Sequence, residues 1–154
     1  MNAGFYGPRQ RRQEMGERIK GKVLVVDDDK NLRALCSDVL SIAGYEVDTA
    51  NDGMDALDMI NVNEYDLVLT DINMPRLDGN RLFETACLKN PALKDRFVFM
   101  TGDTMSVYRN NNRKLFIKPF KVKDLLYHVD SVMAKRPERP RNHAGEINKS
   151  LRVA

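Results

Sequence analysis

The sequence predicts a doubly wound α/β domain, in which a five-stranded parallel sheet carries helices on both faces. Five short apolar runs alternate along the chain with longer segments whose apolar residues recur at helical spacing. Each run ends in an acidic, basic or hydroxyl residue, as a buried strand does where it emerges from a covered sheet. Because parallel strands need crossover connections, and these are right-handed, the helices are expected to cover both faces.

The first half of the chain contains two of these strand-helix units. Residues 23–26 form a β-branched run that stops at three successive aspartates, and a helical pattern follows until Gly44, a residue typical of the position after a helix. Residues 45–49 predict the second strand. The next helix is expected to begin near Asp52.

The second half continues the alternation. Residues 66–70 predict the third strand, which ends at Asp71, and the loop 72–79 contains the proline and glycine typical of turns. The remaining strands are expected at residues 97–100 and 115–117. A strongly amphipathic pattern over residues 122–132 predicts the last helix.

Length and composition fit one globular domain. The chain has 154 residues, of which 42% are hydrophobic and 31% charged, so neither a disordered nor a fibrous class is indicated. No stretch approaches the roughly 18 apolar residues of a membrane span. Residues 1–20 also lack the apolar core of a signal peptide. We therefore expect no membrane span and a cytoplasmic location.

The net charge of +3 is unevenly distributed. Residues 1–22 contain six basic and two acidic residues, and residues 134–154 have the same balance, so the part between them is acidic. Runs of like charge are usually solvated and disordered. We expect a domain at residues 21–134 with flexible basic extensions at residues 1–20 and 135–154.

The ends of the predicted strands gather residues suited to phosphoryl chemistry. Ligands of such sheets bind outside the carboxyl ends of the strands, and the residues that fall there are Asp27, Asp28, Asp71, Thr101 and Lys118. Three neighbouring carboxylates repel one another, and a divalent cation such as Mg²⁺, which prefers oxygen ligands, relieves that repulsion. A lysine and a threonine hydroxyl can pair with phosphoryl oxygens. Since no histidine or cysteine belongs to the pattern, a carboxylate is the available nucleophile.

Four motifs resemble those of response-regulator receiver domains from two-component signal transduction. They are Val25-Val26-Asp27-Asp28-Asp29, then Leu69-Thr70-Asp71-Ile72-Asn73-Met74-Pro75 with Asp78-Gly79, then Met100-Thr101-Gly102, and finally Lys118-Pro119-Phe120. The resemblance extends over roughly residues 21–134. It implies a flavodoxin-like sheet with strand order 2-1-3-4-5 and a phosphoprotein that depends on Mg²⁺.

The resemblance also assigns roles to single residues. It implies that Asp71 is the phosphoacceptor, that Thr101 and Lys118 contact the phosphoryl group, and that the Lys118-Pro119 bond is cis. The implied metal ligands are Asp27, Asp28, Asp71 and the backbone carbonyl of Asn73, with Asp27 acting mostly through metal-bound water. Asp29 is expected to cap a helix instead. Asn73 and Asp103 occupy the positions that tune the lifetime of the acyl phosphate, and polar residues there resemble fast-decaying regulators.

Two features depart from the family pattern. Sixteen residues separate Thr101 from Lys118, fewer than is usual, and three consecutive asparagines disfavour a helix, so the helix between the fourth and fifth strands is expected to be short or disordered. The usual switch aromatic is replaced by Leu115. Phe116 is expected to face the other side of the sheet as ordinary core. The switch candidates are therefore Thr101, Leu115, Phe116 and Tyr108.

The expected partners are a sensor histidine kinase or a histidine phosphotransfer protein, and an unidentified downstream protein. No DNA-binding domain is visible in the sequence. A weak homodimer is a further possible assembly. The chain is expected to act as a signalling domain that assists its own phosphorylation and dephosphorylation, not as an ordinary enzyme. Whether it stands alone or is cut from a hybrid kinase stays open as well.

Two alternatives belong to other functional classes. A haloacid-dehalogenase-like Mg²⁺ phosphatase would use Asp27 as nucleophile and would need threonine at position 31, where this chain has Asn31. A pseudo-receiver would keep the fold as an interaction module without using phosphate. The complete set of acids, with Thr101 and Lys118, argues against the second alternative, whereas the short helix favours it.

Overall fold

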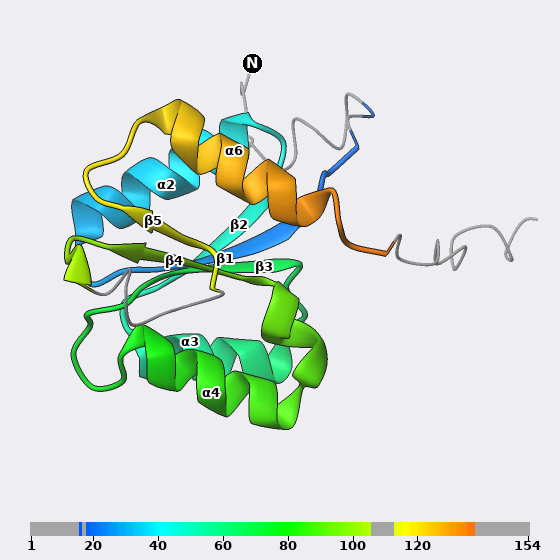
Figure 1. Cartoon of the computed structure of the whole chain (residues 1–154). Coiled ribbons are helices and arrows are strands. Elements are labelled where there is room, and N and C mark those ends of the chain that lie inside the picture. Colours follow the sequence, from blue (N-terminus) through cyan, green and yellow to red (C-terminus); the bar gives the residue numbers. More distant parts are fainter. Residues whose placement is uncertain (1–15, 17, 106–112, 138–154) are drawn as a thin grey trace, which may run out of the picture.

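The computed structural model describes residues 16, 18–105 and 113–137 and contains a five-stranded parallel sheet (Figure 1). Its strand order is β2-β1-β3-β4-β5, which confirms the predicted fold class and order. The strands are β1 (Lys22–Val26), β2 (Glu46–Ala50), β3 (Leu67–Asp71), β4 (Phe97–Thr101) and β5 (Leu115–Ile117). The second and third strands each lie one residue further along the chain than expected. Tyr45 stays outside β2 because its N–H bonds to Leu40 O at the end of the preceding helix.

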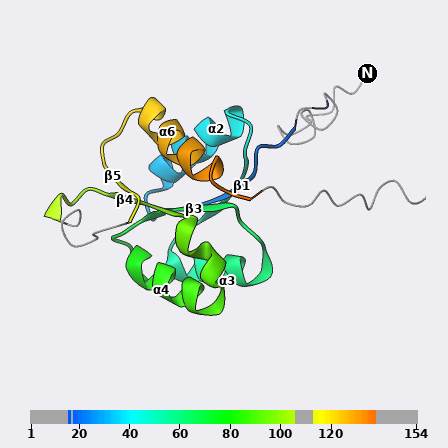
Figure 2. The same ribbon diagram turned by 45° about the vertical axis from the view of Figure 1, so that its right-hand side comes forward.

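Two layers of helices enclose the sheet (Figures 1 and 2). Helices α2 (Lys30–Ile42) and α6 (Val122–Met133) cover one face, and α3 (Gly53–Val62) and α4 (Gly79–Lys89) cover the other. The strands alternate between two cores. Val23 and Val25 belong to the core under α2 and α6, whereas Leu24 and Val26 belong to the core over α3 and α4. Burial on both faces explains why β1 is apolar from Val23 to Val26.

Three of the helices have an aspartate as their N-cap residue. The side chain of Asp29 accepts hydrogen bonds from the backbone of Asn31 and Leu32, which confirms its expected capping role. Asp52 and Asp78 cap α3 and α4 in the same way. Gly44, with φ of 105°, follows the C-cap of α2 as predicted. A five-residue 3-10 helix, η1 (Pro91–Asp95), was not predicted because so short a segment shows no periodicity.

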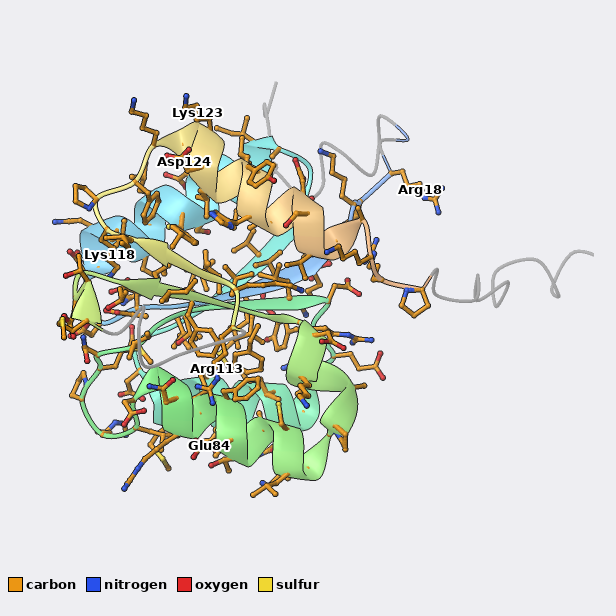
Figure 3. The ribbon with its side chains drawn as sticks, in the orientation of Figure 1. Arg18, Glu84, Arg113, Lys118, Lys123 and Asp124 are labelled. Atoms are coloured by element: carbon orange, nitrogen blue, oxygen red, sulfur yellow. The ribbon has the colours of Figure 1, made fainter. Side chains whose placement is uncertain are left out.

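The connection between β4 and β5 is thirteen residues long, and residues 106–112 of it, where the short helix is expected, lie outside the described residues. Tyr108 lies outside the described residues. The predicted alternation of β5 is confirmed, since Leu115 packs in the core over α3 and α4 and Phe116 is buried in the opposite core. Arg113 folds back onto α4, with its guanidinium 4.5 Å from the Phe83 ring (Figure 3). This arginine therefore covers apolar surface beside the short connection.

Directly before β3, the buried side chain of Asp66 connects the start of β1 with the C-terminal segment. Asp66 Oδ2 accepts a hydrogen bond from Lys22 N at 2.8 Å and pairs with the Arg136 guanidinium at 3.0 Å. The described part of the C-terminal segment is thus attached to the sheet. The expected flexible extensions otherwise lie in residues 1–15, 17 and 138–154, outside the described part. Within the described part, no helix has the length and apolar character needed to cross a bilayer.

We predict that Asp66→Ala lowers the free energy of unfolding by about 2 kcal/mol, because it leaves the Lys22 N–H unsatisfied and the Arg136 guanidinium without this carboxylate. Urea denaturation measures the change. Asp58→Ala, at an exposed position of α3, is the matched control and should shift stability by no more than about 0.5 kcal/mol. Equal effects of the two substitutions would contradict the prediction.

Candidate functional site

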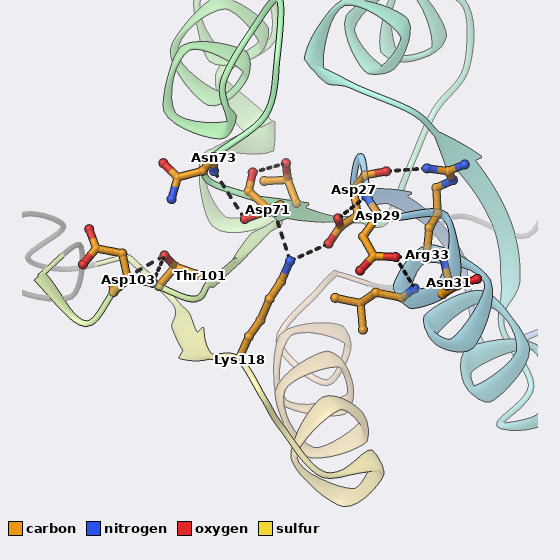
Figure 4. A network of polar contacts seen from close by, with 11 residues as sticks. Asp27, Asp29, Asn31, Arg33, Asp71, Asn73, Thr101, Asp103 and Lys118 are labelled. Carbon is orange, nitrogen blue, oxygen red and sulfur yellow. Dashed lines mark hydrogen bonds and ion pairs between the residues drawn. The ribbon is translucent and has the colours of Figure 1, made fainter.

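The carboxyl ends of the strands bring the predicted site residues together (Figure 4). Asp27 follows β1 and is fully buried, Asp71 is the last residue of β3 and is 7% exposed, and Thr101 ends β4. Lys118 follows β5 and reaches toward the two acids from the other side. Parallel pairing produces this arrangement, because it places Val26 beside Thr70 and Asp71 beside Met100 in register.

Lys118 joins the two buried carboxylates. Its Nζ atom lies 2.7 Å from Asp27 Oδ2 and 3.1 Å from Asp71 Oδ2. A single ammonium group therefore balances charges from two strands that are separated by long stretches of sequence. Without that cation, two carboxylates at this depth would repel one another at low dielectric.

The protonation equilibria reflect the same geometry. Burial raises the pKa of the Asp71 carboxyl, and the nearby charge of Asp27 adds to this, whereas the contacts with Lys118 only partly oppose it. Burial by itself would lower the pKa of Lys118, but the hydrogen bond to Asp27 and the charge of Asp71 raise it overall. Lys118 therefore remains a cation between the acids.

Three carboxylates are close enough to share a cation. Oxygen atoms of Asp27, Asp28 and Asp71 lie within 4.8 Å of one another, and Asp28 is exposed to solvent. An all-oxygen set of acids that is open on one side fits Mg²⁺, which keeps part of its water when bound. Asp29 lies outside this set because its carboxylate caps α2.

Asn73 and Asp103 flank the site as expected from their positions. Asn73 N donates a 3.3 Å hydrogen bond to Asp71 Oδ1, which holds the start of the loop against the acid. Asp103 N donates to Thr101 Oγ1 at 3.0 Å, so the threonine hydroxyl is engaged by the connection that follows it (Figure 4). The metal contact of the Asn73 carbonyl and the tuning role of both residues stay predictions.

Gly79 has a packing role that the sequence did not reveal. A Cβ atom at this position would lie 2.2 Å from the Asp71 carbonyl oxygen, so α4 begins in direct contact with the acid's own backbone. Gly79 N also donates to Ile72 O at 2.9 Å. The Asp78-Gly79 pair was visible as a motif, but only the tertiary contact explains why the residue must be glycine.

Two arginines beside the site were also missed by sequence reasoning. Arg33, one turn into α2, donates to the backbone oxygen of Asp27 at 2.5 Å. Arg76, in the loop after β3, pairs with Asp52 and Asp55 of the α3 region. Arginines in a helix and a loop are too common to indicate such contacts from sequence alone.

Comparison with known proteins gives a consistent result. The family model described as the response regulator receiver domain matches residues 23–130. The sensor histidine kinase RcsC of Escherichia coli K12 is 52% identical over 60 residues, which are 39% of this chain and 6% of that protein. The response regulator MprA of a Mycobacterium species (strain KMS) is 50% identical over 58 residues, 38% of this chain and 25% of that protein. The chain thus spans only a small part of these curated relatives.

Two solved structures share the arrangement over nearly their whole length. The chemotaxis response regulator CheY4 of Vibrio cholerae has 30% sequence identity and a TM-score of 0.65, and the match covers 72% of this chain and 97% of that one. The receiver domain of the hybrid histidine kinase CckA has 28% identity and a TM-score of 0.61, with 73% of this chain and 99% of that one covered.

We predict that Gly79→Ala destabilises the domain by about 3 kcal/mol, since the new methyl group overlaps the Asp71 carbonyl. Gly102→Ala is the matched control, because no atom lies within 4 Å of its Cβ position. It should change the free energy of unfolding by less than about 1 kcal/mol. Urea denaturation of both variants checks this, and an unaffected Gly79→Ala protein would refute the proposed contact.

Proposed function

Because this chain belongs to the response regulator receiver domain family, we propose that Asp71 accepts a phosphoryl group from a sensor histidine kinase or a histidine phosphotransfer protein. The observation that carries the proposal is the position of the Asp71 carboxylate. It ends β3 with Lys118 on one oxygen and the carboxylates of Asp27 and Asp28 nearby.

Phosphoryl transfer to Asp71 forms one bond and breaks one. An Asp71 carboxylate oxygen attacks phosphorus, the bond from phosphorus to the donor's imidazole nitrogen breaks, and the imidazole leaves with its electron pair. The Lys118 ammonium, already 3.1 Å from Asp71 Oδ2, transfers its ion pair to an oxygen of the arriving group. The hydroxyl of Thr101 is then free to donate to another phosphoryl oxygen once its contact with Asp103 is exchanged.

Mg²⁺ held by Asp27, Asp28, Asp71 and the Asn73 carbonyl would offset the negative charge that gathers in this acidic site. The chain's own residues supply the rest of the catalysis by orienting the acid and excluding water from its buried side. In this way the domain assists its own phosphorylation and, when water attacks instead, its own dephosphorylation.

The phosphatase alternative is disfavoured by the surroundings of Asp27. That alternative needs Asp27 as nucleophile, but Asp27 is less accessible than Asp71, although the oxygens of both acids have hydrogen-bond partners. Asp27 Oδ1 accepts from Asp29 N at 2.9 Å, Oδ2 pairs with Lys118, and the residue is fully buried. Asp71 is the more accessible acid. The pseudo-receiver alternative is disfavoured by the closeness of Asp27, Asp28, Asp71 and Lys118, since a module that does not use phosphate has no need for such a cluster of charges.

The signal is proposed to pass to another protein from the surface around β5. Thr101 and Phe116 are buried, and Leu115 is partly exposed on the opposite face of β5. Without an aromatic at position 115, the change at Thr101 must be relayed by Leu115, by Phe116 or by Tyr108, which lies outside the described residues. A cytoplasmic location, a weak homodimer and flexible basic extensions belong to the same proposal.

We predict that acetyl phosphate with Mg²⁺ adds one phosphoryl group to the wild-type protein and none to Asp71→Asn, which lacks the nucleophile. Intact-protein mass spectrometry detects the adduct, and chelation of Mg²⁺ with EDTA should suppress it. Asp58→Asn is the control and should react as the wild type does. Phosphorylation of Asp71→Asn to the wild-type level would overturn the assignment.

We further predict that the acyl phosphate decays within minutes, because Asn73 and Asp103 place polar groups where water approaches it. Removal of acetyl phosphate followed by timed mass spectrometry measures the loss. A half-life of many hours would contradict the tuning role of these two residues.

A further inference from the structure

We infer that Arg76 is a positioning residue for the metal side of the site, because its ion pairs with Asp52 and Asp55 hold the loop that carries Asn73. This inference rests on the proposed Mg²⁺-dependent function. It concerns a residue that does not touch the reacting atoms and acts through the backbone of residues 72–78.

The contacts of Arg76 join the loop to α3 at two points. Arg76 Nε lies 2.6 Å from Asp52 Oδ2, and its Nη2 atom lies 2.7 Å from Asp55 Oδ1. The fixed fork of a guanidinium can hold both acids at once, which a single ammonium group does poorly. Asp52 is largely buried and also caps α3 through the N–H groups of Met54 and Asp55. The acid that anchors Arg76 is therefore itself held by the first turn of α3.

The surroundings of Asp52 agree with a persistent pair. Burial by itself would raise the pKa of this carboxyl, but the backbone hydrogen bond from Asp55 and the hydrogen bond and charge of Arg76 lower it overall. The acid therefore stays ionised opposite the guanidinium. Arg76 is partly exposed, so the pair is accessible to substitution without opening the core.

The backbone of Arg76 shows that its side chain is not incidental. Arg76 has φ of 62°, and it is the non-glycine residue with positive φ within the described part of the chain. Glycine adopts this left-handed conformation most easily. The ion pairs offset the unfavourable conformation of an arginine there, so side chain and backbone conformation support each other.

The loop is fixed on both sides of the position that would face the metal. Next to Arg76, the Leu77 carbonyl lies so close to α3 that a Cβ atom at Gly53 would come within 2.1 Å of it. At the other end, Asn73 N donates to Asp71 Oδ1. Only Met74 and Pro75 separate Asn73 from Arg76. Loss of the ion pairs therefore releases the segment between these two points, and the Asn73 carbonyl, which leads directly into that segment, loses its fixed position.

If the ion pairs of Arg76 only stabilised the fold, their loss would have a different effect on Mg²⁺ binding. An exposed pair that only adds stability would change the unfolding transition and leave Mg²⁺ affinity unchanged. A positioning role changes Mg²⁺ affinity in the folded protein, because the carbonyl of Asn73 is then presented less often in the required place. Mg²⁺ affinity is thus the measurement that separates the two roles.

The test uses Arg76→Gln, with Arg81→Gln as matched control. Arg81 is an exposed arginine at the start of α4, and its substitution removes the same charge close to the site. Isothermal titration calorimetry with Mg²⁺ alone gives the affinity, and the Mg²⁺ concentration for half-maximal phosphorylation by acetyl phosphate gives a second readout. We expect both constants to rise about tenfold for Arg76→Gln and to stay at the wild-type value for Arg81→Gln.

A second set of variants keeps the test valid if Arg76→Gln folds poorly. Arg76→Gly removes the ion pairs, but glycine suits the left-handed backbone, so this variant should retain wild-type stability. Its affinity for Mg²⁺ should nevertheless be lower than that of the wild type. Asp55→Asn should reproduce part of the effect and add little in the double variant with Arg76→Gln. Wild-type Mg²⁺ affinity in folded Arg76→Gly would overturn the inference.

The outcome also distinguishes this inference from the proposed function. A wild-type protein that binds Mg²⁺ but is not phosphorylated would refute the phosphoacceptor role, and the calorimetric comparison of variants would still decide the role of Arg76. A wild-type protein that binds no Mg²⁺ would overturn the inference together with the proposed metal site.

Discussion

The rest of this structure depends on one ion triplet, in which the ammonium of Lys118 holds the buried carboxylates of Asp27 and Asp71 side by side. Lys118 Nζ lies 2.7 Å and 3.1 Å from these acids, which end two neighbouring strands. Burying two like charges is costly unless a cation is shared between them. Lys118 directly follows β5, which pairs with β4, so the triplet ties the end of β5 to the ends of β1 and β3 across the sheet. It also leaves the site prepared for further cations and for an arriving anion.

The edge of the sheet around this triplet is built by close approach of backbone to backbone. Gly79 lets α4 begin on the carbonyl of Asp71, and Gly53 lets α3 begin on the carbonyl of Leu77. Aspartate caps satisfy the free N–H groups of the helices that start along this edge. Little room is left for the loop between β3 and α4 to move, and Arg76 removes more of that freedom. Rigid support from neighbouring elements is what a site of charged groups needs to keep its geometry.

The face of the domain beside the connection between β4 and β5 is built differently. The connection between β4 and β5 is short, and within the described part Arg113 covers the rings of Phe83 and Phe99 at 4.5 and 5.4 Å. The Arg113 guanidinium shields the apolar surface of these rings. It also donates a hydrogen bond to Asn80 and forms an ion pair with Glu84. The chain thus combines a complete set of acids and lysine with an unusual cover on the adjoining face.

The sequence by itself determined the strands and the acids of the site, because apolar runs that end in Asp27, Asp71, Thr101 and Lys118 mark strand ends, and a parallel sheet collects such ends at one edge. It also determined the caps at Asp29 and Asp52 from local chemistry. Only the tertiary structure decided which groups touch. The bridge of Lys118 to both acids, the contact of Gly79 with Asp71 and the pairing of Arg76 with Asp52 join segments far apart in the chain. Such contacts depend on how closely helices approach loops, and no local pattern of residues encodes that distance.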